Sequence, residues 1–365
     1  MIETSFIPAN LKTDSVEEGI ISWRSPSNIA LVKYWGKTEP QIPKNPSISF
    51  TLTNCFTKTT LKYRKKKKES STFEFAVFFE GNRMPAFEPK IKKFMERIVE
   101  YQPFLLAYDF EIHTENSFPH SSGIASSASG MSALALCLMT LEQRIDPSID
   151  TIQFNKKASF LARLGSGSAA RSIEGPLVVW GVHEQVKGSN DLYGIQYPFK
   201  VHEVFMDYQD TVLLVDKGVK QVSSTLGHGL MENHPYSSAR FDQAHAHISQ
   251  LIQVLETGDL DDFIRIVEKE ALALHAMMMT SDPYFILMRP NTLEIIERIW
   301  RFRKETGSKL CFTLDAGANV HLLFPKIEKE SVNRFLTEEI LKFCQNKHFI
   351  SDEAGSGAIK LDDVS

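Results

Sequence analysis

The sequence lacks the features that mark secreted and membrane-spanning proteins. Residues 1–20 contain no basic segment followed by an apolar stretch, which a secretory signal requires. The longest apolar stretch, residues 133–141, includes a threonine and is shorter than the roughly 20 residues that a bilayer-spanning helix needs. Only four cysteines are present, far apart and without a C-x-x-C pair. We therefore expect a cytoplasmic protein with reduced, buried thiols and no membrane partner.

The sequence also has no excess of positive charge. It contains 41 Lys and Arg against 45 Asp and Glu, a formal net charge of −4 over 365 residues. Binding to nucleic-acid phosphates requires a basic surface, so this balance argues against a generic nucleic-acid-binding protein. The basic run at residues 64–68 favours a solvent-exposed hairpin tip, because nothing nearby extends it.

The hydrophobic patterns along the chain mix strands with helices. Alternation predicts a strand at 48–52 and a hairpin formed by 59–63 and 73–79. Apolar residues at helical spacing predict a helix at 91–99, and Asp150 can cap another that reaches about Arg163. Further helices are predicted at 241–255, 260–278 and 291–305, and further strands at 177–182, 211–215, 310–314 and 320–324. The fold class is therefore α+β, and the length favours two domains, which we place at 1–205 and 206–365.

A run of glycine and serine, residues 119–130, leads directly into an Ala/Leu/Met-rich helical stretch. Small residues let the backbone approach a ligand, and the N–H groups at a helix start can bind phosphate. The run contains neither a G-K-[ST] sequence nor G-x-G-x-x-G, so it is not a Walker A loop or a dinucleotide fingerprint. The alternative is a loop of small residues that allows tight helix packing.

Three further segments carry candidate chemistry. Residues 163–172 space two serines by glycine ahead of Arg171, whose guanidinium suits a carboxylate or phosphate. Residues 33–37 set two lysines around a Tyr-Trp pair, and the alternative there is a buried aromatic strand end. Residues 313–319 hold Asp315 between two apolar strands, where a simple turn aspartate is the alternative. Together these segments indicate chemistry on a multiply anionic substrate.

The combination resembles the diphosphomevalonate decarboxylases, a family of the GHMP-type kinases. The matching motifs follow the family order and lie at residues 25–37, 45–52, 118–130, 165–172, 222–225 and 313–319. The resemblance implies a GHMP-kinase fold, with an N-terminal domain like domain 2 of ribosomal protein S5 and a ferredoxin-like C-terminal domain that carries Asp315.

The resemblance also implies a reaction. (R)-5-diphosphomevalonate would be phosphorylated by ATP on its tertiary 3-hydroxyl and then lose phosphate and CO2 to give isopentenyl diphosphate. Asp315 would be the base, Lys33 would keep it ionised, and Arg171, held by Asn28, would clamp the substrate carboxylate. A homodimer is implied as well.

The remaining site residues follow from the same motifs. Those implied to bind substrate are Tyr34, Trp35, Gly36, Lys37, Lys90, Ser166, Gly167, Ser168, Ala169, Ala170, Arg171 and Thr225. Those implied to bind ATP are Pro119, Ser121, Ser122, Gly123, Ala125, Ser126, Ser127, Ser129 and Gly130. No metal site built by the protein alone is expected, because Mg²⁺ would enter with ATP, with Ser127 as a candidate ligand.

The sequence departs from the family pattern at Ala318, where proline is common, and in a shortened loop at 38–44 that contains Gln41. Alternative functions are a phosphomevalonate decarboxylase, a mevalonate 3-kinase of the same superfamily and, more distantly, a non-catalytic RNA-binding module. The basic run at 64–68 is the one feature that favours the last of these.

Overall fold

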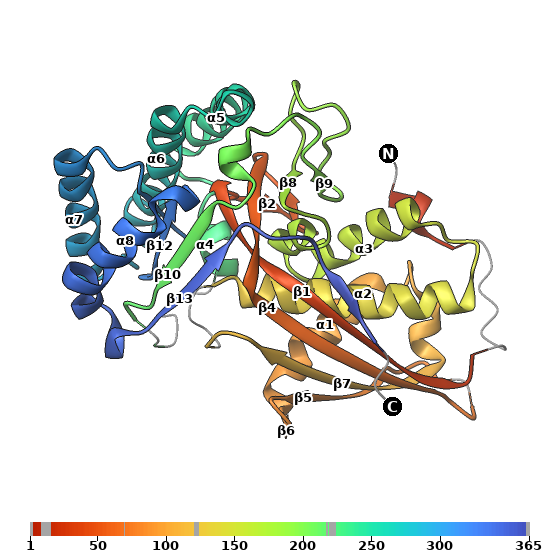
Figure 1. The fold of residues 1–365 in the computed structure, drawn as a ribbon. Coiled ribbons are helices and arrows are strands. Elements are labelled where there is room, and N and C mark those ends of the chain that lie inside the picture. Colours follow the sequence, from red (N-terminus) through yellow and green to blue (C-terminus); the bar gives the residue numbers. More distant parts are fainter. Residues whose placement is uncertain are drawn as a thin grey trace.

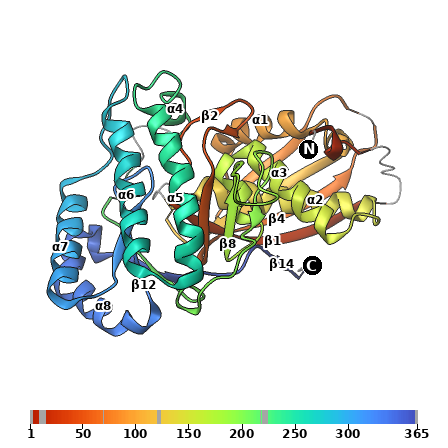
Figure 2. The same cartoon turned by 90° about the horizontal axis from the view of Figure 1, so that it is seen from above.

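A computed structural model of the chain describes residues 3–8, 16–68, 70–119, 124–216, 218 and 224–362. It contains an eight-stranded sheet, a four-stranded sheet and a two-stranded ribbon, with helices packed against the two larger sheets (Figure 1). Seen from above, α5 to α7 lie at one end of the molecule and α1 to α3 at the other, with β1 reaching between them (Figure 2). The predicted α+β class is confirmed.

The large sheet has the order β14-β1-β4-β7-β5-β6, and β8 pairs with both β4 and β9. Its strands are β1 (Glu18–Val32), β4 (Ser47–Lys65), β5 (Glu74–Phe79), β6 (Asn82–Arg83), β7 (Tyr108–Asn116), β8 (Leu177–Trp180), β9 (Ile195–Gln196) and β14 (Ile359–Leu361). β1 and β4 are long antiparallel partners, paired from Glu18 with Arg64 to Val32 with Ile48. β2 (Lys37–Thr38) and β3 (Ile42–Pro43) form the two-stranded ribbon that follows β1.

The predicted hairpin between residues 59–63 and 73–79 is wrong. Both segments are strands, but β7 lies between them, antiparallel to β4 and parallel to β5. Alternation identifies a strand and its buried face without identifying its partner. Parallel strands need a crossover connection, and here α1 (Glu88–Ile98) provides it.

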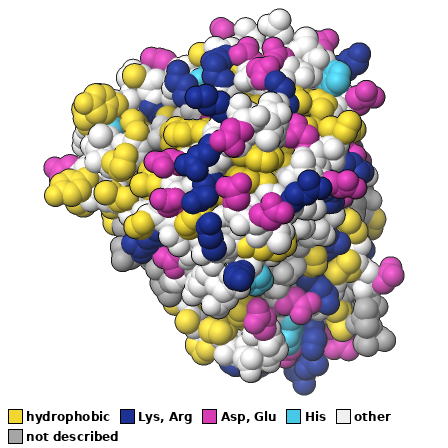
Figure 3. Space-filling view, turned by 60° about the vertical axis from the view of Figure 1, so that its left-hand side comes forward, with side chains coloured by type: hydrophobic (Ala, Val, Ile, Leu, Met, Phe, Trp, Pro, Cys, Tyr) yellow, Lys and Arg dark blue, Asp and Glu magenta, His cyan; other side chains and the backbone are white. Residues whose placement is uncertain are grey.

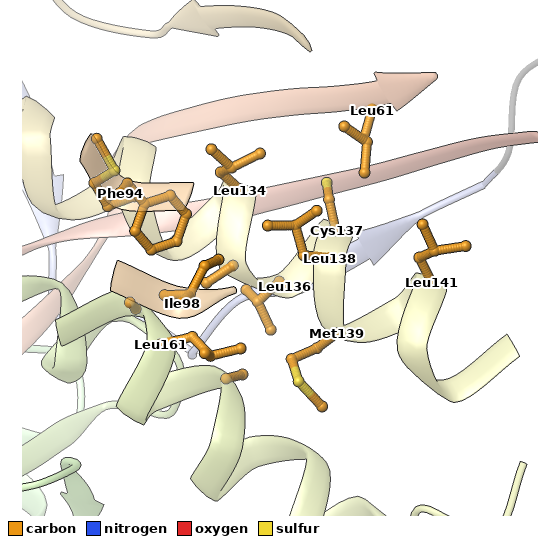
Figure 4. Packing of buried hydrophobic residues seen from close by; sticks show 14 of the residues in the cluster. Leu61, Phe94, Ile98, Leu134, Leu136, Cys137, Leu138, Met139, Leu141 and Leu161 are labelled. Atoms are coloured by element: carbon orange, nitrogen blue, oxygen red, sulfur yellow. The ribbon is translucent and has the colours of Figure 1, made fainter. Parts of the chain in front are cut away.

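Three helices cover one face of the large sheet, and α2 (Ser126–Ile145) lies at the centre of that layer. Leu61 of β4, Phe94 of α1 and Leu161 of α3 (Thr151–Gly165) surround it (Figure 4). Because α2 is apolar on nearly all sides, it can only be stable when covered all round. Asp150 caps α3 as predicted, since its side chain accepts a hydrogen bond from the Gln153 N–H.

The small sheet is antiparallel, in the order β11-β12-β10-β13. Its strands are β10 (Gln209–Leu213), β11 (Cys311–Leu314), β12 (Val320–Phe324) and β13 (Phe349–Glu353). The helices of this half are α4 (Ser224–Gly229), α5 (Ser237–Thr257), α6 (Leu260–Met279), α7 (Pro290–Thr306) and α8 (Lys329–Phe335). The strands and long helices predicted here all form, with ends shifted by a few residues.

Side chains from both sheets share one apolar cluster. It contains Ile29 of β1, Phe50 of β4, Val212 of β10, Ile248 of α5 and Phe263 of α6. The end of the chain also crosses between the sheets, because β13 belongs to the small sheet and β14 pairs with β1. The domain boundary near residue 205 stays a prediction.

The outer face of the small-sheet half carries Lys and Arg side chains interspersed with Asp and Glu (Figure 3). Mixed charges of this kind produce a weak long-range field. Among the helices that the structure describes, none combines the length and apolar character that crossing a bilayer requires.

Candidate active site

A cavity of about 580 Å³ opens where the large sheet, the start of α2 and the β11–β12 loop meet. Most of the predicted site residues line it, although they come from five separate parts of the sequence. They are Lys33, Tyr34, Trp35, Lys37, Lys90, Ala125, Ser126, Ser127, Gly130, Ser166, Gly167, Ser168, Arg171 and Asp315.

Lys33 and Asp315 form an ion pair at this cavity, with 3.1 Å between Nζ and Oδ1. Lys33 directly follows β1 and its side chain is 2% exposed, whereas Asp315 directly follows β11 and is 26% exposed. Burial lowers the pKa of Lys33, and the Asp315 charge opposes that shift. The Asp315 backbone is held as well, because Nε2 of His275 on α6 lies 3.1 Å from its carbonyl oxygen.

The backbone of Lys33 is fixed by a buried charge network that the sequence analysis missed. The Lys33 N–H donates to Oε2 of Glu270 (2.8 Å), and its carbonyl accepts from Arg240 Nη2 (3.1 Å). Arg240 and Glu270 form an ion pair at 2.5 Å, and His247 Nδ1 lies 2.5 Å from Glu270 Oε1. The sequence did contain a sign of this network, because Glu270 follows Phe263 and Val267 at helical spacing. A charged residue on the apolar face of a helix indicates a buried charge that needs a partner.

Arg171 is buried in a short 3₁₀ helix, Gly167–Ser172. Its Nη1 donates to Ser47 Oγ at 2.5 Å and its Nη2 to Asn28 Oδ1 at 3.4 Å. Its Nε is buried without a hydrogen-bond partner among the described residues. Burial lowers the pKa of Arg171 to about 10, so the guanidinium stays positive at neutral pH. A rigid guanidinium with a donor still unsatisfied is suited to a carboxylate or phosphate ligand.

Tyr34 adds a second unsatisfied donor. Its hydroxyl is buried and has no partner among the described residues. Burial raises the pKa of Tyr34, so the phenol stays protonated and can donate a hydrogen bond. Lys37, three residues on, already contacts Gln41 Oε1 at 2.7 Å and Glu39 Oε1 at 3.4 Å.

His228 of α4 is a cavity residue that the sequence analysis did not select. Its ring lies between those of Tyr34 and Trp35, at centroid distances of 4.3 and 4.6 Å. Its Nδ1 accepts a hydrogen bond from the Gly36 N–H at 3.0 Å. Gly36 has φ of +95°, a conformation that favours glycine. With eleven histidines in the chain, nothing in the spacing distinguished this one.

The first turn of α2 faces the cavity through Ser126, Ser127 and Gly130. The first peptide N–H groups of a helix have no intrahelical acceptor, so a helix start is suited to an anion. The Ser127 hydroxyl lies 3.3 Å from that of Ser166, so the two glycine-serine segments meet here. A Cβ added to Gly130 would meet nothing within 4 Å, so this glycine borders open space rather than packed atoms.

Another part of the cavity is mostly apolar, with Thr59 and Thr114 beside the apolar side chains, and was not predicted. Side chains from β5, β7, α1 and α2 form it together with Phe87, which precedes α1. They are Val77, Phe79, Phe87, Ile91, Ile112, Met131 and Leu134. The cavity therefore joins this apolar chamber to a polar wall lined by Ser126, Ser127, Ser166 and Arg171.

Some predicted residues do not line the cavity. Asn28 lies behind Arg171, and Ser129 points to the sheet, where its hydroxyl is 2.6 Å from Thr57 Oγ1. Gly36, Pro119, Ala169 and Ala170 are also outside the lining. Ser121, Ser122, Gly123 and the side chain of Thr225 lie outside the described residues. Within the described part of the chain, no cluster of three His, Cys, Asp or Glu could hold a metal ion.

Two family models match the chain in sequence order. Residues 25–191 match the diphosphomevalonate decarboxylase-like N-terminal domain, and residues 211–362 match the mevalonate 5-diphosphate decarboxylase C-terminal domain. The diphosphomevalonate decarboxylase of Ganoderma lucidum is 28% identical, over 89% of this chain and 82% of that protein. The phosphomevalonate decarboxylase of Haloferax volcanii is 27% identical, over 86% and 89%.

Solved structures agree with these matches. The Staphylococcus aureus mevalonate diphosphate decarboxylase has a TM-score of 0.79 and 27% identity, covering 94% of this chain and 98% of that one. MDDEF in complex with MVAPP, AMPPCP and magnesium has the same TM-score and identity, covering 94% and 99%. The likeness over nearly the whole chain confirms the predicted fold.

Proposed function

The chain belongs to the diphosphomevalonate decarboxylase family, and we propose on this premise that it converts (R)-5-diphosphomevalonate and ATP to isopentenyl diphosphate, ADP, phosphate and CO2. The observation that supports this most is the Lys33–Asp315 ion pair, which lines the same cavity as the buried Arg171. A carboxylate beside a fixed cation is suited to removing a proton from a substrate hydroxyl that an anion site holds in place.

The first step is phosphorylation of the tertiary 3-hydroxyl. Asp315 accepts the hydroxyl proton while the oxygen attacks the γ-phosphorus of ATP, and ADP leaves. The positive charge of Lys33, 3.1 Å from Asp315, keeps the carboxylate ionised and therefore able to accept the proton. Phosphorylation comes first because hydroxide is a very poor leaving group, whereas phosphate can leave the tertiary C3.

The second step is elimination. Phosphate leaves C3 with its bonding electrons, the bond between C2 and the carboxylate carbon breaks, and that electron pair becomes the new double bond as CO2 departs. Ser47 and Asn28 hold the Arg171 guanidinium in place, and Arg171 orients the substrate carboxylate. Arg171 lines the cavity and keeps its positive charge at neutral pH, which supports this role.

The arrangement of the cavity fits a nucleotide. The first turn of α2, with Ser126 and Ser127, would hold the phosphates, and the apolar chamber beside Met131 would hold the base. Mg²⁺ bound with ATP would neutralise phosphate charge, and Ser127 is the hydroxyl that we propose near it. Lys90, which the sequence motifs assign to substrate binding, also lines the cavity.

The decisive experiment replaces Asp315 by asparagine and follows ADP and CO2 together. Loss of the base should lower kcat by about 10²–10⁴ fold while substrate binding changes little. Asp261→Asn is a matched control, because Asp261 is 80% exposed and lies outside the cavity. Wild-type turnover in Asp315→Asn would remove this residue from the mechanism.

A second candidate substrate is 5-phosphomevalonate, because the Haloferax volcanii protein named for it is 27% identical, against 28% for the Ganoderma lucidum diphosphomevalonate decarboxylase. Comparing kcat/KM for the two substrates decides between them. Release of ADP without CO2 would indicate a mevalonate 3-kinase and would refute the proposed decarboxylation.

Three further expectations stay proposals. The cytoplasmic location can be tested by cell fractionation, and the homodimer by light scattering. The domain boundary near residue 205 can be tested by limited proteolysis.

A further inference from the structure

His228 has a single protonation pattern that its surroundings impose. Its Nδ1 accepts a hydrogen bond from the Gly36 N–H at 3.0 Å. A ring nitrogen that accepts must keep its lone pair, so the imidazole is neutral and carries its proton on Nε2. Among the residues that the structure describes, none accepts a hydrogen bond from that Nε2–H.

The direction of this N–H is also fixed. The ring is held between Tyr34 and Trp35, tilted by 34° and 38° from their planes. Turning the ring would cost both aromatic contacts as well as the bond from Gly36. A donor held in this way can bind a ligand without losing further side-chain freedom.

The neighbours of His228 indicate what kind of ligand it meets. Lys37, Tyr34 and Arg171 line the same cavity, and the buried Tyr34 hydroxyl has no hydrogen-bond partner among the described residues. Burial, followed by the charges of Lys37 and Arg171, lowers the pKa of His228 to about 3. Asp315 is the one carboxylate among the described lining residues, so the donors beside His228 favour an anionic ligand there.

We propose that the Nε2–H of His228 donates a hydrogen bond to the phosphate tail of the substrate and thereby sets the affinity of the site for that tail. The identity of the substrate rests on the proposed function, whereas binding of an anion beside His228 does not. A neutral donor adds affinity here without placing a further cation beside Lys37 and Arg171.

Three variants at position 228 separate this role from support of Gly36. In His228→Asn, the amide oxygen can replace Nδ1 as acceptor for Gly36, but no donor reaches the place of Nε2. In His228→Gln, the amide nitrogen replaces the Nε2–H, and the acceptor is lost. His228→Phe keeps a ring and loses both groups.

The probes are inorganic pyrophosphate and (R)-5-diphosphomevalonate, titrated by calorimetry without nucleotide. Losing one hydrogen bond to a charged group should raise Kd about 10- to 100-fold in the Asn and Phe variants. The Gln variant should stay within about 3-fold of wild type. His113→Asn is the control, since His113 stacks on Phe78 and does not line the cavity.

Wild-type affinity in His228→Asn, or a loss in His228→Gln as large as in His228→Phe, would overturn the proposal and leave His228 as a support for Gly36. The proposed function fails separately. If the wild-type protein binds pyrophosphate and the variants show the expected pattern, yet no CO2 is released, the decarboxylase assignment is wrong and the donor role of His228 stands.

Discussion

Replacing Glu270 by leucine tests how the fold holds Lys33 in place. The Glu270 carboxylate is fully buried and accepts from Arg240, from His247 and from the Lys33 N–H. Burial raises the pKa of Glu270, but the Arg240 charge and the bond from His247 outweigh this effect and lower the pKa. The carboxylate is therefore charged and fully paired in the folded protein.

In Glu270→Leu, the Arg240 guanidinium stays buried without its counter-charge, so the free energy of unfolding should fall by about 3–5 kcal/mol. Adding Arg240→Met removes the orphaned charge and should restore a large part of that loss. Because Lys33 loses an anchor in the single variant, kcat should fall by at least about tenfold, while the KM for ATP changes little.

Urea unfolding of both variants, with steady-state kinetics under the same conditions, measures these effects. Asp262→Ala is the control, because its pair with Arg265 is half exposed on both sides, and such pairs contribute about 0–1 kcal/mol. A loss below about 1 kcal/mol in Glu270→Leu, or no recovery in the double variant, would refute the reasoning.

Two further predictions concern other buried charges. Arg171→Lys should raise the KM for (R)-5-diphosphomevalonate at least about tenfold in steady-state kinetics, because one ammonium group cannot reach Ser47, Asn28 and a carboxylate together. An unchanged KM would contradict the role of Arg171 in binding the carboxylate. Burial lowers the pKa of His321, but the charge and hydrogen bond of Asp210 outweigh it, so the folded pKa is raised. Stability from this pair is complete below about pH 6.5 and is lost as pH rises through the folded pKa. Wild type should therefore lose stability relative to His321→Asn above pH 6.5 in urea titrations, and a pH-independent difference would contradict this.

Local patterns predicted individual elements well and their partners poorly. The helical spacing of residues 241–255 and the cap at Asp150 both correspond to helices in the structure. The hairpin between 59–63 and 73–79 failed because strand alternation carries no information on which strand lies alongside. A helix forms from contacts between residues three or four apart, so a short stretch of sequence is enough to predict it. The pairing of β4 with β7 joins residues far apart in the sequence, so no short stretch predicts it.

The candidate site likewise contains residues that local sequence patterns predicted and residues that they did not. The glycine-serine segments at 119–130 and 165–172 were visible because phosphate sites need small residues and hydroxyls in one short stretch. His228 and Glu270 were not selected, because each acts through contacts with residues far away in the sequence, His228 on Gly36 and Glu270 on Lys33.

The amino-acid sequence by itself determined the fold class, most of the helices and the motifs that resemble one enzyme family. Only the tertiary structure decided which of those side chains share a cavity and which donors remain unsatisfied there. The physical reason is that periodicity and capping act over a few residues, whereas the ion pair of Lys33 with Asp315 joins positions 282 residues apart. Such a contact exists only after two sheets have packed around a common apolar cluster.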